Sequence, residues 1–364
     1  MHNVTYIFMI DKILIIQSGG VFLLKGLILV AGKGTRLQPF SLSRAKTLIP
    51  VANKPLLEYC IESLKKIGIN EIGIVLNPAQ KDVCEYIDHR PADNTSITLI
   101  YQPKANGIGD AVKQASDFLK TEPFILLLGD NLINESLLSL KEAILSSSIN
   151  GAVLITRVFN PSDYGIAHVE NNQIIKVEEK PINSTSNLAI IGAYAFDSKM
   201  LTAINHIQPS SRGEYEITDA IQWLINHQYN ISYQITNKEY SDVGTIERWF
   251  EANRWVLDSL NRSEETTDPS TIIKNCKLIP PVHIDKNCVI TNSTIGPYVS
   301  VSQGAVIDNC RIQDSIVLEN VYVSDVSSLI THSIFGKGTK IDKLHIETAS
   351  IECLFFDYTK IISK

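Results

Sequence analysis

Two kinds of hydrophobic pattern divide the chain. Between residues 25 and 260, short runs of leucine, isoleucine and valine alternate with longer segments whose apolar residues recur at helical spacing. This pattern predicts strands at Gly26–Val30, Glu71–Leu76, Ile97–Tyr101, Phe124–Leu128 and Ala152–Thr156. It predicts helices between them at Leu56–Ile67, Ala79–Ile87, Gly109–Leu119 and Leu137–Ser146. Near-continuous apolar strands separated by helices are typical of a mostly parallel sheet covered on both faces, which is an α/β fold.

The later part of this region predicts strands that follow one another without helices between them. They lie at Gly165–Val169, Gln173–Glu178 and Ala189–Phe196, and helices follow at Thr218–Asn226 and Ile246–Ser259. Strands joined by short turns pair antiparallel, so we expect a Rossmann-like sheet that is mixed but mostly parallel. The added strands would close a pocket over the parallel core.

A different period begins after the polar stretch at 261–269. Apolar residues then recur at every sixth position in three runs, namely Ile272, Leu278, Ile284 and Ile290, then Ile295, Val301 and Ile307, then Val317, Val323, Leu329, Phe335 and Ile341. A six-residue repeat is typical of a hexapeptide solenoid, a parallel β-helix with three sides to a coil. We expect these residues to point inward and Cys276 and Cys288 to be packing residues. Such modules stack on copies of themselves, so we also expect a homo-oligomer.

The first 24 residues are apolar but carry no recognisable targeting signal. They lack a basic start and a small-residue cleavage site, and Asp11-Lys12 and Gly19-Gly20 interrupt them, so we predict neither a signal peptide nor a membrane span. We hypothesise that translation starts at Val21 or Leu24, in which case residues 1–23 pack poorly and are dispensable for activity. The predicted organisation is an N-terminal extension (1–24), an α/β domain (25–260) and a β-helix domain (270–364).

Composition narrows the function classes. With 364 residues, the chain is long enough for two domains. Its net charge of −6 and its scattered lysines and arginines give no electrostatic footprint for nucleic acid or an anionic membrane. The six cysteines lie far apart, without a C-x-x-C pair or a histidine cluster, so neither a zinc site nor a disulfide framework is indicated. We therefore expect a cytoplasmic protein that binds neither nucleic acid nor membrane.

Candidate chemistry begins where the first predicted strand runs into the loop Gly32–Leu37, with the sequence GKGTRL. A strand that ends in a glycine-rich turn exposes several backbone N–H groups, which form a concave anion site suited to phosphates. The loop is not a P-loop, because Gly34 follows Lys33 where a serine or threonine is needed. It is not the dinucleotide-binding fingerprint either, because Leu37 occupies the third glycine position.

This loop is part of a wider resemblance. Five segments carry it, namely Lys25–Leu37, Ser43–Leu57, Gly129–Asn131, Glu179–Pro181 and Arg212–Leu224. Together they resemble the sugar-1-phosphate nucleotidylyltransferases, and most closely the long-form glucose-1-phosphate thymidylyltransferases, which carry a C-terminal left-handed β-helix. The resemblance implies a nucleotidyltransferase domain with a GT-A-like fold. It also implies transfer of a thymidylyl group from dTTP to glucose 1-phosphate, giving dTDP-glucose and pyrophosphate, with Mg²⁺ as the cofactor.

The resemblance assigns roles to particular residues. Arg36 and Lys46 are the expected catalytic cations, because an anionic phosphate nucleophile needs no base but needs its charge neutralised. The expected nucleotide-binding residues are Gly32, Gly34, Thr35, Gln102 and Gly107. The expected sugar-phosphate-binding residues are Tyr164, Gly165, Glu179, Lys180, Asn187, Gly192 and Arg212. Asp130 and Asp242 are the expected ligands of Mg²⁺, which takes few carboxylates and keeps phosphate oxygens among its other ligands. Taken without the resemblance, the two aspartates also suit a turn and a helix cap.

Three departures from the family pattern bear on rate and nucleotide preference. Ala45 stands where proline usually precedes the lysine, so we expect a less rigid loop around Lys46. Gly109-Asp110 replaces the more usual Ala-His after the base-binding glycine, and Val243 replaces the threonine that commonly follows the metal-binding aspartate. None of them removes a charged catalytic group.

Other functions remain open on the sequence. The first alternative is a uridylyl- or guanylyltransferase, or a dual-specificity enzyme, acting on a hexose 1-phosphate. Gln102 argues against a purine as the normal base but suits thymine and uracil alike. A second alternative is acetyl transfer by the β-helix, with His283, His332 or His345 as the base. A third is a non-catalytic regulatory subunit, although such a protein is expected to lose its phosphate-binding cations.

Overall fold

The computed structural model describes residues 5–9, 12–17, 20–32, 34–146, 148–171, 173–260 and 267–362, with the backbone alone before residue 23. Its contacts separate two compact units. The first, here called the α/β unit, comprises residues 1–32 and 57–240. The second, the β-helix unit, comprises residues 33–56 and 241–364. Each unit is described by itself.

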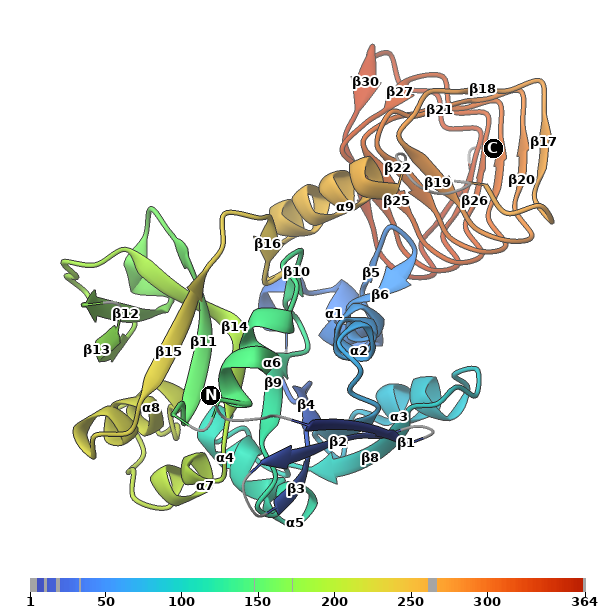
Figure 1. Cartoon of the computed structure of the whole chain (residues 1–364). Coiled ribbons are helices and arrows are strands. Elements are labelled where there is room, and N and C mark those ends of the chain that lie inside the picture. The colour runs from blue at the N-terminus through green and yellow to red at the C-terminus, as the bar shows by residue number, and fades with distance from the viewer. Residues whose placement is uncertain are drawn as a thin grey trace. The chain divides into compact units, whose positions relative to one another are not determined.

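A nine-stranded mixed sheet forms the centre of the α/β unit (Figure 1). Its strands are β4 (Lys25–Leu29), β7 (Glu71–Leu76), β8 (Ser96–Tyr101), β9 (Phe124–Leu128), β11 (Gly151–Arg157), β12 (Gly165–Glu170), β13 (Gln173–Glu179), β14 (Leu188–Phe196) and β15 (Ile231–Ile235). Strand β4 pairs in parallel with β7 and β9, and β7 pairs in parallel with β8. Strand β14 is antiparallel to β9, and β12 is antiparallel to β13 and β14. The predicted mixed, mostly parallel sheet is therefore confirmed.

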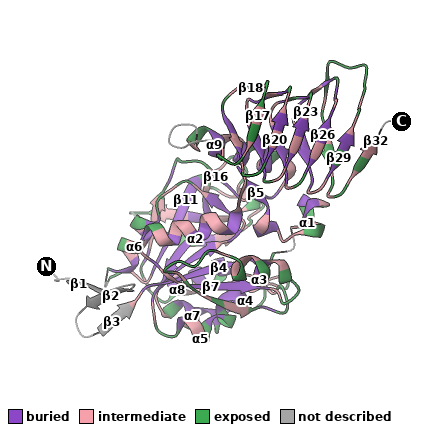
Figure 2. Cartoon of the chain, turned by 90° about the vertical axis from the view of Figure 1, so that its right-hand side faces the viewer, coloured by how far each residue is buried: buried purple, intermediate pink, exposed green. Residues whose placement is uncertain are grey.

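Helices cover both faces of this sheet. They are α2 (Leu56–Lys66), α3 (Lys81–Asp88), α4 (Ile108–Gln114), α5 (Ser116–Leu119), α6 (Leu138–Ile144), α7 (Lys199–Ile204) and α8 (Ile217–Asn226). Helices α4, α7 and α8 share one buried cluster with Leu27 of β4. The neighbouring Gly26 points the other way, and a Cβ added there would lie 2.6 Å from Leu64 on α2. Strands β4, β7 and β9 are buried almost throughout, whereas β8, which ends the sheet, is not (Figure 2).

The segment before β4 forms a three-stranded antiparallel sheet. Its strands are β1 (Thr5–Met9), β2 (Lys12–Gln17) and β3 (Gly20–Leu23). The side chains of residues 1–22 lie outside the described residues, so the expectation that this segment packs poorly stays a prediction. None of the helices in the described part of the chain is long and apolar enough to cross a membrane.

Three stacks of short parallel strands form the β-helix. The first contains β17 (Ile272–Lys274), β20 (Val289–Thr291), β23 (Val306–Asp308), β26 (Tyr322–Ser324), β29 (Lys340–Asp342) and β32 (Lys360–Ile362). The second contains β18 (Lys277–Leu278), β21 (Thr294–Ile295), β24 (Arg311–Ile312), β27 (Leu329–Ile330) and β30 (Ser350–Ile351). The third contains β19 (Val282–Ile284), β22 (Val299–Val301), β25 (Ser315–Val317), β28 (Ile334–Phe335) and β31 (Leu354–Phe355). Three such sides confirm the solenoid predicted from the six-residue repeat (Figure 1).

The residues predicted to point inward are buried in the middle of the solenoid, whereas three of the predicted positions are not. Ile272 and Leu278 are 48% and 36% exposed, and Leu329 is only half-buried. At two of them the next residue takes the inward place, because Ile273 pairs with the buried Ile290 and Ile330 pairs with the buried Ile312. Leu278 has the expected register, but its strand β18 ends its stack and no further strand of that stack covers it.

Cys288 is buried in the solenoid core and Cys276 packs against that core, as predicted for packing residues. Burial raises the pKa of the Cys288 thiol, which keeps it protonated and unreactive at neutral pH.

Residues 33–56 and 241–260 pack onto the β-helix within the same unit. They contain η1 (Thr35–Leu37), α1 (Phe40–Ser43), η2 (Lys46–Leu48), β5 (Pro50–Val51), β6 (Lys54–Pro55) and α9 (Ile246–Leu260). Asn253 of α9 is 1% exposed, and its Oδ1 accepts the Ala52 backbone N–H (2.8 Å) and the Ser300 hydroxyl of β22 (3.1 Å). Arg44 forms two hydrogen bonds with the Glu319 carboxylate, at 2.8 and 3.3 Å. The coils thus hold the segments that carry Arg36 and Lys46.

We predict that Asn253→Ala destabilises the β-helix unit, because it leaves the buried Ala52 N–H and Ser300 hydroxyl without their acceptor. The expected loss is about 2 kcal/mol or more of unfolding free energy, measured by urea unfolding with tryptophan fluorescence. Ser300→Ala is the matched control, since it removes one donor and leaves the bond to Ala52, and it should cost about 1 kcal/mol. Equal stability of Asn253→Ala and the natural chain would contradict the account.

Candidate active site

The carboxyl ends of parallel strands gather several predicted residues at one edge of the α/β sheet. Strand β4 runs into the loop that contains Gly32. After β9, Gly129 donates its backbone N–H to the Leu29 carbonyl of β4 (2.8 Å), which places Asp130 beside the same loop. Gln102 directly follows β8, two strands from β4 in the same parallel set. Gly32, Asp130 and Gln102 therefore share the edge at which ligands bind in open α/β sheets.

Asp130 sits on a tightly packed turn. Burial, and then the charge of Asp130, raise the pKa of the Cys60 thiol on α2 to about 12. Beside this turn Gly192 has φ +72°, and a Cβ there would lie 2.1 Å from the Asn131 amide nitrogen. Glycine at 192 thus allows β14 to pass against the turn that carries Asp130. A direct sugar contact of Gly192 stays a prediction.

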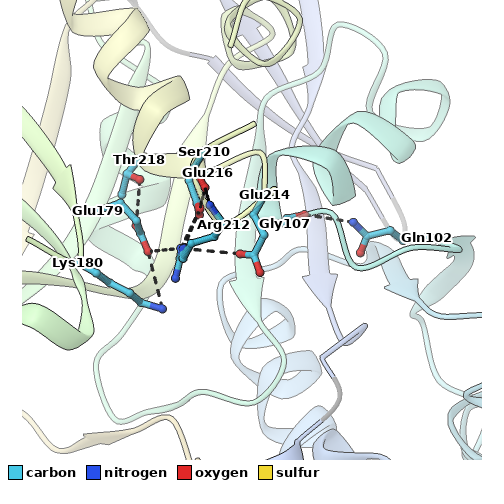
Figure 3. Close-up of polar contacts among 9 residues, drawn as sticks. All are labelled: Gln102, Gly107, Glu179, Lys180, Ser210, Arg212, Glu214, Glu216 and Thr218. Carbon is cyan, nitrogen blue, oxygen red and sulfur yellow. Dashed lines mark hydrogen bonds and ion pairs between the residues drawn. The ribbon is translucent and has the colours of Figure 1, made fainter. Parts of the chain in front are cut away.

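Gln102 is almost fully buried, at 3% exposure, and its amide is held from two sides. Its Nε2 group donates to the Gly107 carbonyl (3.1 Å) and to Asp110 Oδ2 (2.7 Å). Among the described residues, no hydrogen bond to its Oε1 accompanies these two bonds from Nε2. In Figure 3 the dashed line to Gly107 starts at the Gln102 nitrogen, and no dashed line reaches the amide oxygen. The side chain therefore offers an approaching ligand a hydrogen-bond acceptor.

Two glycines let the loop around Gln102 lie directly on another segment. Gly107 has φ +98°, and a Cβ there would lie 2.7 Å from the Tyr215 carbonyl oxygen. At Gly109 a Cβ would lie 2.8 Å from the same oxygen, which accepts the Gly109 N–H at 2.8 Å. The glycine that departs from the family's alanine thus admits this close contact. It ties the Gln102 loop to the segment that begins at Arg212.

Glu179, Lys180 and Arg212 lie together (Figure 3). Arg212 Nη2 lies 3.0 Å from Glu179 Oε1 and 2.8 Å from Glu216 Oε1, and a third carboxylate, on Glu214, lies 3.8 Å away. Glu179 also accepts the Thr218 hydroxyl at 3.0 Å. Burial, and then the nearby Glu216 charge, raise the pKa of Glu179. In this arrangement Arg212 orients Glu179. A contact between Arg212 and the phosphate of a sugar stays a prediction.

The other predicted sugar-side residues differ in their surroundings. The Tyr164 carbonyl accepts the Lys180 N–H (3.0 Å). Gly165 pairs with Glu179 across β12 and β13, and a Cβ there would lie 2.7 Å from Thr218. Asn187 is exposed, and its Oδ1 accepts a long hydrogen bond from Arg157 (3.4 Å). Gly165 thus joins the Glu179 cluster, whereas the described contacts of Asn187 lie outside it.

In the β-helix unit, the glycine-rich loop packs on the segment that carries Lys46. Gly34 has φ +60°, and a Cβ there would lie 2.9 Å from Lys46 Cβ. Its carbonyl accepts the Ser41 hydroxyl at 2.7 Å. Thr35 and Arg36 follow on η1 and are exposed, whereas Lys46 is buried at the start of η2. The structure therefore brings the two predicted loops of this unit into contact.

Asp242 lies among cations of the same unit. Its Oδ1 accepts from Arg248 Nη1 (2.6 Å) and from the Gly244 N–H (3.1 Å). A Cβ on Gly244 would lie 3.0 Å from Arg36 Nη2, which places that guanidinium beside the Asp242 loop. Burial alone would raise the pKa of Asp242, but the Arg248 bond and the Arg248 and Lys46 charges outweigh it and lower the pKa. Asp242 is therefore ionised at neutral pH and able to bind a cation.

The structure shows the backbone conformation at two of the three departures from the family pattern. Ala45 has φ −59°, which is the angle that a proline would impose, so its loop has the conformation expected of the family residue. Val243 is fully buried with φ +36°, a region that β-branched residues rarely occupy. This strained residue adjoins Asp242, and backbone strain of this kind is concentrated at functional sites.

Sequence reasoning missed several partners of the predicted residues. Asp110 holds Gln102, Arg248 holds Asp242, and Glu216 holds Arg212. Asp110 had been noticed only as a departure, and Glu216 lay inside a segment that carried the resemblance. Arg248, six residues after Asp242 on α9, had no signal in the sequence beyond its charge.

The donor set fits Mg²⁺ only if a substrate completes the site. Among the described residues, no group of three or more His, Cys, Asp or Glu side chains is arranged to hold a metal ion. Mg²⁺ commonly takes one or two carboxylates together with waters and substrate phosphates. Asp130 and Asp242 are carboxylates of this kind, and their role as ligands of Mg²⁺ stays a prediction.

Two of the three histidines considered for acetyl transfer are engaged in packing within the β-helix unit. His332 stacks on Phe250 of α9 at a ring distance of 3.9 Å and lies 3.1 Å from Asp314. His283 contacts the Ala52 carbonyl at 3.0 Å. His345 is exposed. His283 and His332 thus have structural partners that explain them without acetyl transfer.

In open α/β sheets, nucleotides and other ligands bind at the carboxyl edge of the parallel strands, where the Gly32 loop and Asp130 lie. The model of the nucleotidyl transferase family matches residues 25–259, and that of the GMPPB C-terminal domain matches residues 278–353. The chain therefore belongs to the nucleotidyl transferase family.

The similarity to known proteins extends along most of the chain. It is 34% identical over 335 residues to the low-salt glycan biosynthesis nucleotidyltransferase Agl11 of Haloferax volcanii, which covers 87% of this chain and 94% of the relative. A glucose-1-phosphate thymidylyltransferase of Streptomyces griseus is 30% identical over 332 residues, covering 87% and 93%. A crystal structure of a Bacillus anthracis protein, provisionally assigned as a glucose-1-phosphate thymidylyltransferase, matches with a TM-score of 0.60 and 30% identity over 67% of this chain and 98% of that chain. The chain is accordingly a sugar-1-phosphate nucleotidyltransferase.

We predict that Arg248→Met lowers stability in a pH-dependent way. The pKa of Asp242 is lower in the folded chain than in the unfolded chain. The ion pair therefore stabilises the fold above the unfolded carboxyl pKa, and this stabilisation disappears as the pH falls through the folded value. The expected loss at pH 7 is about 1 kcal/mol by urea unfolding, shrinking below about pH 4.

Arg248→Lys is the matched control, since it keeps the charge and should lose less stability. A loss that is the same at pH 7 and pH 3 would show that the Asp242 carboxylate is not the partner that matters.

Proposed function

We propose that this protein transfers a thymidylyl group from dTTP to glucose 1-phosphate, giving dTDP-glucose and pyrophosphate, with Mg²⁺ as its cofactor. The observation that carries the nucleotide assignment is the orientation of Gln102, whose Oε1 is the atom left to meet a base. An acceptor there suits the N3–H of thymine and of uracil. The thymidylyltransferase relative supports thymine, which differs from uracil by one methyl group.

UTP is the second candidate nucleotide. One methyl group in an apolar pocket is worth only about 1–3 kcal/mol, so a site that accepts thymine also accepts uracil with modest loss. Neither base is distinguished from the other by the Gln102 acceptor.

Charge neutralisation is the main chemical task of the proposed reaction. A phosphate oxygen of the sugar 1-phosphate attacks the α-phosphorus of the triphosphate, and the bond to the departing pyrophosphate breaks. The nucleophile is already anionic, so no general base is required. We assign Arg36 to the triphosphate and its leaving group, and Lys46 to the phosphates of the two substrates. Both fixed cations would act where charge develops during transfer.

Mg²⁺, held by Asp130 and Asp242, would supply further neutralisation of the triphosphate. On the sugar side, Glu179 would accept hydroxyl groups, in an orientation fixed by Arg212 and Thr218. Lys180 is exposed beside it and would reach the sugar's phosphate.

The proposal predicts a ranking of nucleotides. Pyrophosphate release is measured with glucose 1-phosphate and Mg²⁺ against dTTP, UTP, CTP, GTP and ATP separately. We expect dTTP to give the highest kcat/KM, with UTP next and the other three far lower. A preference for UTP would replace the thymidylyl assignment by uridylyl transfer. No pyrophosphate release with any of the five nucleotides would refute both assignments.

The metal assignment predicts that Asp130→Asn abolishes turnover, by at least about a hundredfold, without loss of folding. The far-ultraviolet circular dichroism and the urea midpoint should stay close to those of the natural chain. Asp117→Asn, at an exposed carboxylate of α5, is the matched control and should leave turnover unchanged. Normal turnover of Asp130→Asn would refute its role as a metal ligand.

A further inference from the structure

We propose that Asp110 is a positioning residue that determines which bases the nucleotide site accepts, an inference that rests on the function proposed above. Asp110 lies on α4, eight positions after Gln102 in the sequence, and is almost fully buried. Its Oδ2 accepts a hydrogen bond from Gln102 Nε2 at 2.7 Å. Its other oxygen accepts a longer bond from Gln114 Nε2 at 3.3 Å. No step of the proposed reaction uses Asp110 directly.

The contact fixes the orientation of the Gln102 amide. Nε2 carries two hydrogens, and both face acceptors, the Gly107 carbonyl and the Asp110 carboxylate. A reversed amide would place Oε1 against those same two acceptors and leave both without a donor. Loss of a hydrogen bond to a buried charged group is costly, so the carboxylate selects one of the two amide orientations.

The selected orientation decides what the site can recognise. With Nε2 held inward, Oε1 faces outward as an acceptor that no described donor reaches. Thymine and uracil carry an N3–H donor that it can accept. Cytosine presents an N3 acceptor in the same place, so two lone pairs would face each other and both would lose their hydrogen bonds. A site built around one hydrogen bond rejects bases that lack the matching group far better than it rejects a missing methyl.

Glutamine alone does not give this selectivity. Its amide can present either an oxygen or an NH₂ group, and the Gly107 carbonyl is a single neutral acceptor. Asp110, at the position where the family more often has histidine, therefore fixes the Gln102 amide so that it presents its oxygen as an acceptor.

The test replaces one carboxylate oxygen of Asp110 by an NH₂ group. Asp110→Asn is nearly isosteric, but its Nδ2 can donate to Gln102 Oε1, which makes the reversed amide available. Initial rates with dTTP, UTP and CTP are measured at saturating glucose 1-phosphate. Dissociation constants of UTP and CTP are measured by calorimetry without sugar phosphate. We expect the preference for UTP over CTP to fall at least tenfold in both experiments, while the KM for glucose 1-phosphate stays unchanged.

Two further variants separate positioning from general loss of structure. Gln114→Leu removes the other partner of Asp110 and leaves the bond to Gln102, so it should keep the UTP preference. Asp110→Ala leaves the amide held by Gly107 alone, so its preference should fall between those of the natural chain and Asp110→Asn. A merely structural role would weaken all nucleotides alike.

An unchanged UTP-to-CTP ratio in folded Asp110→Asn would overturn the inference. So would a natural chain that binds UTP and CTP equally. If the natural chain binds UTP over CTP in an Asp110-dependent manner but turns over no nucleotide, the proposed function fails while this inference stands.

Discussion

The parallel pairing of β4 with β7 and β9 is the constraint on which the rest of the α/β unit depends. Parallel strands that point the same way end at the same edge, so residues distant in sequence arrive together there. The pairing carries the Gly32 loop, Asp130 and Gln102 to that edge. A slip of one residue would exchange the two faces of a strand, moving Leu27 out of its buried cluster and Gly26 away from Leu64 of α2.

The β-helix anchors the segment that carries the two expected catalytic cations. Its coils bind residues 33–56 through Arg44 with Glu319 and through Ala52 with Asn253 and Ser300. The two expected catalytic cations are therefore anchored to the solenoid, whereas the base and sugar groups belong to the α/β unit.

Hydrophobic periodicity predicted the elements well because strands and helices bury their faces locally. Strands Glu71–Leu76 and Phe124–Leu128 have the predicted bounds. Helix α7, strand β15 and the N-terminal sheet were not predicted. The register errors at Ile272 and Leu329 arose because the repeat is not strictly six residues, and pairing between coils decides which neighbour points inward. Asp110 and Arg248 were missed for a similar reason, since a side chain's partner depends on packing that a linear pattern does not contain.

The most direct test of the account is a crystal structure of the protein with dTTP and Mg²⁺. The account predicts the triphosphate on the loop that contains Gly32 and Arg36, and thymine N3 within about 3 Å of Gln102 Oε1. Asp130 or Asp242 should then ligate the metal together with a phosphate oxygen. A base bound away from Gln102, or a Gln102 amide that turns its NH₂ group toward thymine, would contradict it.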